Sequence, residues 1–431
     1  MLDKIFLKLE RFVPEKWHRV LSHEGFKRYF ANTGWMFFGQ MFSLLVSFFI
    51  GAWIARYLGP KNYGIVSYVV AFVGLFGFIS TLGVDGILNR ELVSHPEKRD
   101  ELMGTAFRLK LFGGGLAFIV AVVCAFMFSG ADVFIRALII MFSLSLFLQA
   151  PFVISIFFYS NVKAKENIKS QILAAIISSI LKIILILSGA GVIWLLFIYT
   201  ADSLWQVIFL LRSYRAQGLK ISAWRFNTDL AKNLWRNSWP LMLSSAAAFI
   251  YLRIDQVMVG KIMGEEAVGI YAAGVKITEI FYFLPGIICG SLFPAIINAR
   301  NTNKELYYRR LNFFYFLLGG LGLIIAIPIA FLAKPIISII FGAEYLAAIP
   351  VLQIYVWSSV GLFLASAAGQ QLVAENRSKM IFIISFFAMI INIILNIILI
   401  PKIGLIGAAI ATLIAYFVTP IWMLFLKREN T

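Results

Sequence analysis

The sequence is poor in charged residues and nearly devoid of cysteine. Of its 431 residues, 14% are charged and 61% are hydrophobic, whereas a soluble globular protein has about 25% charged and about 45–50% apolar residues. A soluble chain of this length needs far more polar surface, so the composition argues against a large soluble enzyme. The two cysteines, Cys124 and Cys289, both lie inside apolar runs, which argues against a disulfide framework.

Sequence signatures of nucleotide use and of sugar-transfer catalysis are missing as well. The sequence contains no Gly-x4-Gly-Lys-Ser/Thr phosphate loop, so this chain is not expected to use ATP. It contains no Asp-x-Asp pair, and the three histidines, His18, His23 and His95, fall outside the apolar runs. We therefore predict no catalytic residue, no metal site and no cofactor, and we expect the protein not to be an enzyme.

Long apolar runs dominate the chain instead. A helix needs about 20 mostly apolar residues to cross the bilayer core, and lipid offers no partner for exposed backbone groups, so such runs predict helices. We expect an all-α integral membrane protein with twelve transmembrane helices, at residues 33–57, 65–85, 108–129, 135–159, 170–188, 191–211, 238–260, 269–297, 311–332, 349–374, 379–401 and 404–426.

The first 32 residues are basic and lack the apolar core of a signal peptide. Ile5, Leu9 and Phe12 recur at helical spacing among lysines and arginines. This pattern favours an amphipathic helix on the cytoplasmic membrane surface, although a solvated leader fits the same residues.

Lysine and arginine are distributed unevenly between the two sets of connections. Of the 38 basic residues, 29 fall on the N-terminus, the C-terminus and the loops on their side, and six fall on the opposite side. Basic residues in short loops favour the cytoplasmic side, which predicts a multi-pass protein of the inner membrane with both termini cytoplasmic. The net charge of +17 is thereby explained by topology, and we expect no nucleic-acid partner.

The two halves of the chain resemble each other. "WIARYLGPKNYGIVSY" at residues 53–68 aligns with "MVGKIMGEEAVGIYAA" at residues 258–273, and a shift of 205 places Gly59 on Gly264 and Gly64 on Gly269. Further matches are Gly113 and Gly114 with Gly319 and Gly320, and "AKEN" at 164–167 with "VAEN" at 373–376. An internal repeat of six helices has the same orientation in both halves, as in transporters whose substrate site lies between the halves.

This repeat predicts two parallel six-helix bundles around a central cavity. The expected segments are an amphipathic N-terminal segment at 1–32, an N-terminal bundle at 33–212, a cytoplasmic linker at 213–237, a C-terminal bundle at 238–426 and a tail at 427–431.

Several motifs resemble one family of exporters. They are "YLGPKNYGIVSY" after the first span, "TLGVDGILNREL" after the second, "YLRIDQVMVGKIMGEEAVGIYAAGVKITEIFYFLPGII" in the seventh and eighth, and "FGAEYLAAIPVLQI" before the tenth. As a set they resemble the polysaccharide-export and O-antigen repeat-unit flippases of the multidrug/oligosaccharidyl-lipid/polysaccharide exporter superfamily. The resemblance covers Thr33 to about Leu426. The related lipid II flippases typically have two further helices.

The resemblance implies translocation of an undecaprenyl-diphosphate-type oligosaccharide from the inner to the outer leaflet by alternating access. It also implies membrane lipids, H⁺ or Na⁺, and polysaccharide polymerase and chain-length proteins as partners. Two alternatives stay open: a multidrug antiporter of the same superfamily, and a membrane glycan polymerase of the same pathway.

Ionisable residues within the spans are candidates for function, because charges at membrane depth are costly and usually face a cavity. They are Asp85, Lys182, Asp202, Arg253, Asp255, Lys276 and Glu279. With the shift of 205, the charged residues of the seventh and eighth spans correspond to apolar residues or glycines of the first half. The repeated scaffold therefore does not require these charges.

Helical geometry separates the charges of the seventh span. Consecutive residues advance by about 100°, so Arg253 and Asp255 point about 200° apart, whereas Arg253 and Gln256 share a face. We expect Arg253, Gln256, Lys182 and Lys276 to bind an anionic substrate, since arginine suits phosphate. Asp255 is expected to pair with a basic group on a neighbouring helix, with Lys276 one candidate.

The remaining acidic residues and the prolines are assigned more loosely. Asp255, Glu279 and Asp202 are expected to couple transport to an ion or to form structural ion pairs. Asp85 is placed at the outer end of the second span as a helix-end residue, with Arg90 as a possible partner. Pro285, Pro294 and Gly286 predict a hinge or a static bend in the eighth span.

Overall fold

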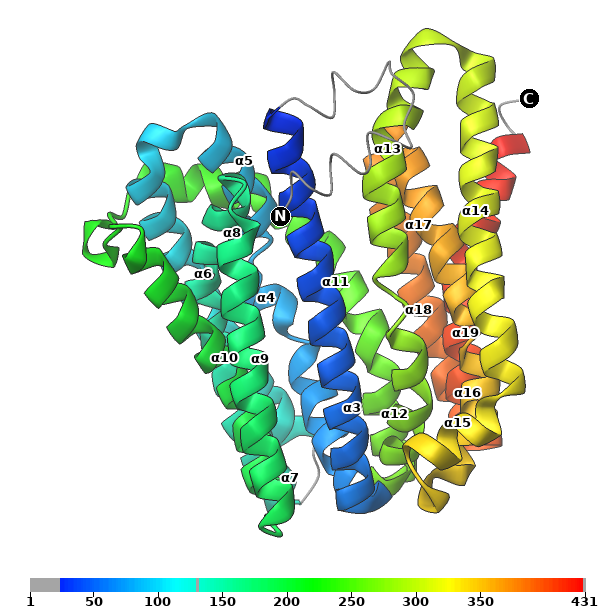
Figure 1. The fold of residues 1–431 in the computed structure, drawn as a ribbon. Helices are drawn as coiled ribbons and strands as arrows, with labels where there is room; N and C mark the ends of the chain where they lie inside the picture. Colours follow the sequence, from blue (N-terminus) through cyan, green and yellow to red (C-terminus); the bar gives the residue numbers. More distant parts are fainter. Residues whose placement is uncertain (1–23, 129–131, 429–431) are drawn as a thin grey trace.

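The structure is a computed structural model, and it describes residues 24–128 and 132–428. Within these residues every regular element is helical. The ribbon forms two groups of long helices that lie side by side (Figure 1). The groups separate toward the end of the molecule where α3 begins and α19 ends, and they meet at the opposite end. Of the predicted amphipathic segment 1–32, residues 1–23 lie outside the described residues, and residues 24–32 form the start of α3.

The first group contains the helices up to α10. They are α3 (Glu24–Gly74), α4 (Gly77–Thr81), α5 (Val84–Ser94), α6 (Arg99–Phe128), α7 (Val133–Ser143), α8 (Val153–Ser160), α9 (Ala164–Leu187) and α10 (Val192–Ala216), with 3-10 helices η2 (Pro96–Lys98) and η3 (Leu144–Phe152) between them. A short η4 (Ile221–Ala223) follows α10 and leads to the second group.

The second group runs from α11 to α19. Its elements are α11 (Thr228–Met263), α12 (Glu265–Glu279), α13 (Leu284–Thr302), α14 (Lys304–Phe331), α15 (Ala333–Ile340), η5 (Ala343–Ala348), α16 (Ile349–Tyr355), α17 (Ser358–Ala374), α18 (Ser378–Ile403) and α19 (Leu405–Arg428). We call the two groups the N-lobe and the C-lobe.

Twelve crossings are consistent with these helices. Eleven described helical segments are long and apolar enough to span a membrane, and the first, Asn32–Gly74, is 43 residues long. It contains two crossings, because the backbone leaves helical geometry at Gly59. The second crossing then continues through α4 and α5. Side chains such as Phe331, 84% exposed, and Phe316, 78% exposed, give the surface an apolar character suited to lipid.

Equivalent glycines break the chain in the two halves. Gly59 has φ +69° and ψ 169°, and Gly264 has φ +88° and ψ 178°. Residues with a Cβ rarely adopt such positive φ values, so both positions require glycine. The shared conformation at positions 205 apart supports the internal repeat at its best-matched motif.

The two lobes meet where α3 crosses α12. A Cβ on Gly64 would overlap the backbone carbonyl oxygen of Glu265, and a Cβ on Gly269 would overlap that of Pro60. Because 60 and 265, like 64 and 269, are repeat equivalents, the contact is reciprocal about a pseudo-two-fold axis. Two glycines thus permit a backbone-to-backbone approach between the lobes.

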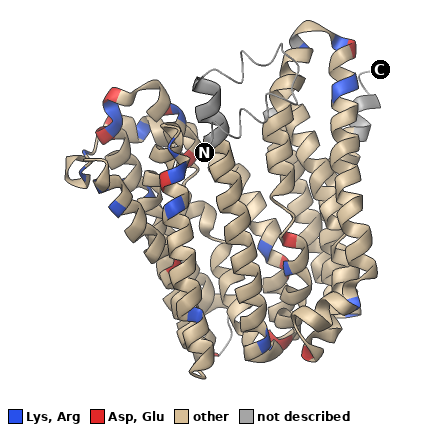
Figure 2. Cartoon of the chain, in the orientation of Figure 1, with Lys and Arg blue, Asp and Glu red and all other residues tan. Residues whose placement is uncertain are grey.

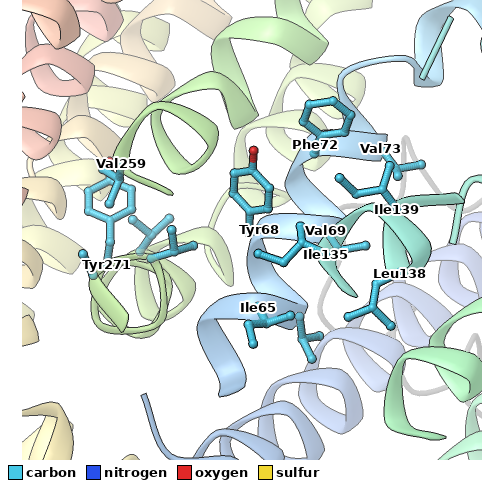
Figure 3. Packing of buried hydrophobic residues seen from close by; sticks show 14 of the residues in the cluster. Ile65, Tyr68, Val69, Phe72, Val73, Ile135, Leu138, Ile139, Val259 and Tyr271 are labelled. Atoms are coloured by element: carbon cyan, nitrogen blue, oxygen red, sulfur yellow. The ribbon is translucent and has the colours of Figure 1, made fainter. Parts of the chain in front are cut away.

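Apolar side chains surround this crossing and make one core across the lobe boundary. Tyr68 and Phe72 of α3 pack in a cluster that also contains Ile139 of α7 and Val259 and Tyr271 of the C-lobe (Figure 3). The Tyr345 hydroxyl, fully buried, donates a hydrogen bond to the carbonyl oxygen of Ala55 at 2.7 Å. The lobes are therefore sealed at this end by packing and by a hydrogen bond.

The other two repeat matches do not hold in the expected register. Glu375 is the residue that ends α17, whereas Glu166 lies in the first turn of α9. The residue that matches Asn376 (φ +59°) in conformation is Val162 (φ +55°), which follows α8. The "AKEN" and "VAEN" alignment was therefore wrong, because a four-residue identity is too short to specify register.

The alignment of Gly113 and Gly114 with Gly319 and Gly320 is also out of register in the structure. A Cβ on Gly114 would meet the backbone of Leu146, and in the second half Gly322 approaches the backbone of Val360 in the same way. A Cβ on Gly320 would meet nothing within 4 Å. The close approach is repeated, but not at the glycines that the sequence alignment paired.

Candidate functional site

A polar pocket lies inside the N-lobe, between α3, α9 and α10. Its volume is about 220 Å³, and its lining is rich in hydroxyl and amide groups: Ser43, Ser47, Gln171, Ser178, Ser179, Tyr199, Ser203 and Gln206, together with Lys182, Asp202 and Gly51. Helices with small polar residues on one face can enclose such a space at membrane depth. The pocket offers both hydrogen-bond donors and acceptors to a ligand.

Lys182 and Asp202 form an ion pair in this pocket. The Lys182 ammonium lies 2.6 Å from Asp202 Oδ2 and 4.2 Å from the centroid of the Tyr199 ring. The Ser178 hydroxyl donates to the other carboxylate oxygen. Lys182 was predicted to bind substrate, and Asp202 to couple an ion or to form a structural ion pair; in the structure both residues line the pocket and pair with each other.

Lys276 reaches this site from the opposite lobe. It belongs to α12, yet its ammonium lies 5.9 Å from the centroid of the Tyr63 ring and against Gly51, both on α3. A Cβ on Gly51 would collide with the Lys276 ammonium. Among the described residues, no carboxylate lies within ion-pair distance of Lys276, in contrast to Lys182. The site at Gly51 therefore carries a net positive charge.

Arg253 has an acidic partner in its own lobe. Its guanidinium lies 3.4 Å from Glu279 Oε1, with side chains 37% and 26% exposed. Its aliphatic stem lies near Gly74 of the N-lobe, 3.8 Å from where a Cβ would be. Although Lys276 and Glu279 are three residues apart on α12, they contact different groups. Arg253 lies at the lobe boundary and is paired with Glu279.

Asp255 is buried and is held by hydroxyl groups rather than by a cation. It is 1% exposed, and its Oδ2 accepts hydrogen bonds from the Tyr271 hydroxyl at 2.6 Å and the Thr412 hydroxyl at 3.2 Å. Its Oδ1 accepts from the backbone N–H of Gln256 at 2.8 Å. The expected pairing of Asp255 with a basic residue, Lys276 included, was wrong because Tyr271 and Thr412 occupy the space around the carboxylate.

Two asparagines extend this hydrogen-bonded cluster. The Asn392 side-chain amide donates to Thr412 at 3.4 Å, and the Asn396 amide donates to Asn392 Oδ1 at 3.1 Å. All three side chains are at most 1% exposed. The Asn396 Oδ1 atom is buried without a hydrogen-bond partner among the described residues. We call Asp255, Tyr271, Asn392, Asn396 and Thr412 the Asp255 cluster.

The asparagines of this cluster were not predicted, although the sequence carries a signal for them. They are not ionisable, but "NIILN" places two amides four residues apart within a long apolar run. Residues four apart share a helix face, so paired amides at membrane depth indicate a polar interior surface of α18.

The remaining predicted residues are placed as follows. Gln256 is 5% exposed and is shielded from the space between the lobes in this conformation. The eighth crossing is interrupted at residues 280–283, and Pro285 stands in the first turn of α13. A Cβ added to Gly286 would meet no atom within 4 Å, and Pro294 lies inside α13. The predicted bend exists, and hinge motion about it stays a prediction.

Asp85 lies elsewhere than expected. The second crossing continues through α5 to Ser94, so Asp85 is on the side of the molecule where α3 begins and not at the outer end. Its carboxylate pairs with Lys110 of α6 at 2.8 Å, and Arg90 pairs with Glu91 instead. Lys110, at the start of the third predicted span, was counted only among the cytoplasmic-side basic residues, but its side chain is 1% exposed.

This pair predicts an asymmetry between two substitutions. Asp85→Asn leaves the buried Lys110 ammonium without its anion, which costs about 3 kcal/mol or more for a buried pair. Lys110→Met leaves a carboxylate that is 48% exposed, for which about 1 kcal/mol is expected. Thermal unfolding of the purified variants in detergent should show the larger loss for Asp85→Asn, and the reverse order would contradict this account.

Comparison with known proteins identifies the family. Residues 29–300 match the family described as polysaccharide biosynthesis protein, and residues 240–398 match the MatE family. A protein of Haloferax volcanii named as flippase AglR is 30% identical over 57% of this chain and 51% of its own length. A protein of Shigella flexneri named as an O-antigen transporter is 23% identical over 88% of this chain and 93% of its own length.

The chain spans about half the length of the first curated relatives that it matches, so their activities carry over only as proposals. Two solved structures share the fold. An inward-facing multidrug resistance MATE transporter of the MOP superfamily has a TM-score of 0.73 at 15% identity, with 90% of this chain and 96% of that chain covered. The lipid II flippase MurJ in an inward closed conformation has a TM-score of 0.69 at 17% identity, with 93% and 87% covered.

These matches and the two-lobe arrangement of twelve crossings agree with the resemblance seen in the sequence motifs. The chain belongs to the polysaccharide biosynthesis protein family, and it is a multi-pass membrane protein with the two-lobe fold of the MOP-superfamily structures.

Proposed function

We propose that this protein is a flippase that moves a polyprenyl-diphosphate-linked oligosaccharide from the inner to the outer leaflet by alternating access. The relatives named as a flippase and an O-antigen transporter support this substrate class. The proposed membrane is the cytoplasmic one, with both termini inside. Most lysines and arginines gather at the end where α3 begins and α19 ends (Figure 2), which supports that orientation.

The observation that carries this proposal is the Lys276 ammonium at the polar N-lobe pocket, which has no carboxylate within ion-pair distance among the described residues. A diphosphate is an anion that needs a cation in a poorly solvated site, and charge-assisted hydrogen bonds are the strong ones there. Lys276 supplies a positive charge, and the hydroxyl and amide groups of Ser47, Gln171 and Gln206 suit the first sugar. Because Lys276 belongs to the C-lobe and Gly51 to the N-lobe, a bound anion would contact both lobes.

A direct test uses liposomes that contain the purified protein and a fluorescent undecaprenyl-diphosphate disaccharide. Chemical quenching from outside reports how much probe has reached the outer leaflet. Protein-dependent translocation that an unlabelled lipid-linked glycan slows is the expected result. Export of a cationic dye without translocation of the lipid probe would contradict the proposal, and would favour the multidrug antiporter that the MatE match raises.

We further propose that the Asp255 cluster binds the coupling ion, a monovalent cation. The cluster holds one carboxylate, two amide oxygens and two hydroxyls within α11, α12, α18 and α19. Groups of three or more His, Cys, Asp or Glu are absent from the described residues, which disfavours a divalent metal. The buried Asn396 Oδ1 atom has no hydrogen-bond partner among the described residues, so it is free to bind a cation. Sodium is bound by several oxygen atoms at once, and the cluster offers neutral oxygens around a single carboxylate. A proton would bind to the carboxylate alone and would not need the amide oxygens.

Asp255→Asn tests this cation site. The substitution keeps the size and the hydrogen-bonding ability of the side chain but removes its charge. Loss of one charged contact is worth about 1.5–3 kcal/mol, so we expect the sodium stimulation of translocation to fall by about tenfold or more. The measurement is the translocation rate against sodium concentration at constant ionic strength, with potassium as the balancing ion. Stimulation by a pH gradient in place of sodium would assign the carboxylate to protons.

A further inference from the structure

A second internal pocket lies in the C-lobe, next to the Asp255 cluster. It has a volume of about 210 Å³ and is enclosed by α11, α17, α18 and α19. Since water in a protein cavity occupies about 30 Å³, the pocket has room for several water molecules. It has no charged residue in its lining, and neither the proposed substrate site nor the Asp255 cluster includes its residues.

The pocket continues the faces of the helices that carry the Asp255 cluster. On α11, Tyr251 and Ala248 lie one and two turns from Asp255. On α18, Ala388 and Ser385 stand in the same relation to Asn392, and on α19, Tyr416 and Thr419 stand so to Thr412. Spacings of four and seven residues keep side chains on one helix face. On each of these three helices, one face therefore carries both pocket-lining residues and a residue of the Asp255 cluster. We call this shared face the stripe.

The stripe leads toward the end of the molecule where α19 ends. Tyr251 and Ala248 precede Asp255 on α11, whose first residue, Thr228, follows the connection from the N-lobe. Thr419 follows Thr412 toward the C-terminus. The pocket thus lies between the Asp255 cluster and the side on which the connection between the lobes and the end of α19 are found.

Oxygen atoms line the route without a charge that would trap an ion. Ser366, Ser385, Thr419 and the two tyrosines supply hydroxyl groups. The Tyr416 side chain is 2% exposed, and its hydroxyl lies near those of Tyr251 and Tyr282 without a well-oriented hydrogen bond to either. The Tyr251 and Tyr416 rings lie 4.6 Å apart, centroid to centroid. A group of buried hydroxyls at this position has the chemistry to contact water or a partly hydrated cation.

We propose that the C-lobe pocket is a vestibule through which a hydrated monovalent cation exchanges between the Asp255 cluster and the side of the molecule where α19 ends. Neutral hydroxyl groups replace part of the hydration shell without binding the ion tightly, as conduction requires. The Tyr251 and Tyr416 pair stands between the vestibule and the cluster. This inference rests on the cation site proposed above.

Gly369 offers a way to fill the vestibule. It lines the pocket, and a Cβ at this position would meet nothing within 4 Å. Gly369→Leu therefore adds a side chain whose Cβ meets no neighbour and which extends from the pocket wall. Gly320→Leu is the matched control, because its Cβ position in the same lobe is also free and it lies outside the lining of the pocket.

The first experiment measures sodium binding to the purified variants by stopped-flow tyrosine and tryptophan fluorescence. A blocked route slows association and dissociation together, so Gly369→Leu should slow the approach to equilibrium by about tenfold, since access limits the association rate, while the final amplitude stays the same. Gly320→Leu should leave the rate unchanged. An unchanged rate in Gly369→Leu overturns the vestibule, provided that Asp255→Asn abolishes the signal. If Asp255→Asn still binds sodium, the proposed cation site itself is wrong.

The second experiment does not depend on the cation site. In a variant whose Cys124 and Cys289 are replaced by serine, Ser385→Cys is treated with a cationic methanethiosulfonate reagent on vesicles of either orientation. Labelling from the side where α19 ends, reduced by Gly369→Leu and not by Gly320→Leu, is expected. Absence of labelling, or labelling from the opposite side only, overturns the vestibule.

Discussion

Lys276→Gln is expected to reduce translocation of the lipid-linked probe by about 10- to 100-fold, because a charge-assisted hydrogen bond contributes about 1.5–3 kcal/mol and each 1.4 kcal/mol is a factor of ten. Glutamine keeps a hydrogen-bond donor and most of the side-chain length, so the loss isolates the charge. The rate is measured by quenching of the fluorescent probe in liposomes at matched protein density.

The control for this prediction is Lys334→Gln, which removes an exposed lysine at the start of α15. It should translocate the probe at the unsubstituted rate. Lys276→Arg should retain much of the activity, because the charge is kept. If Lys276→Gln inserts normally and translocates at the unsubstituted rate, the diphosphate is not bound at Lys276 and the site assignment is wrong.

Gly64→Val is expected to prevent the lobes from closing at the α3 and α12 crossing. The added side chain would overlap the Glu265 carbonyl oxygen, and a backbone atom cannot rotate away as a flexible side chain can. The lobe contact must then separate by the size of a methyl group or more. Overpacking costs about 1–3 kcal/mol, so the population of this closed conformation should fall by about tenfold or more.

The reciprocal geometry sharpens this second prediction. Gly269→Val presses on Pro60 at the same crossing, so it should have the same effect, and the double variant should lose less than the sum of the single effects because one contact is shared. Disulfide trapping across the crossing and probe translocation measure closure and transport. Gly86→Val, whose Cβ position is free, is the control. Additive losses in the double variant would show that the two glycines do not form a single gate.

The substrate site and the crossing are linked through α12. Lys276 and Gly269 lie on this helix seven residues apart, which is about two turns, and both contact α3. An anion bound between Lys276 and the N-lobe therefore lies next to the contact that must open for release on the far side. Alternating access, as we propose it, uses the same helix pair to hold the diphosphate and to seal its exit.

Much of the architecture was predictable from the sequence. The number of crossings and the two-lobe repeat depend on the lengths of apolar runs and on glycine spacing, which are local properties of the chain. Gly59 and Gly264 were aligned correctly because a positive φ combined with a ψ near 180° is a conformation that essentially only glycine adopts. The short "AKEN" match failed because no such backbone requirement supports it.

The candidate site was only partly predictable. Each ionisable residue predicted in the membrane interior lies beside other polar groups in the structure. The sequence did not indicate which group most of these residues would contact. Lys182 pairs with Asp202 on the next helix, whereas Lys110, counted only as a basic residue at a helix start, is buried against Asp85. The positions of charged residues in the sequence indicate where a polar side chain must be buried in the membrane. They do not indicate which helix faces contact each other.

The sequence by itself determined that this is a twelve-helix membrane protein with a repeated scaffold, since burial in lipid requires long apolar helices whatever their packing. Only the tertiary structure decided that Asp255 accepts hydrogen bonds from Tyr271, 16 residues away, and Thr412, 157 residues away. It also decided that Lys276 lies beside the opposite lobe, with no carboxylate of the described chain within ion-pair distance. Such pairings depend on the rotation and tilt of helices distant in the chain, which packing sets and local sequence does not.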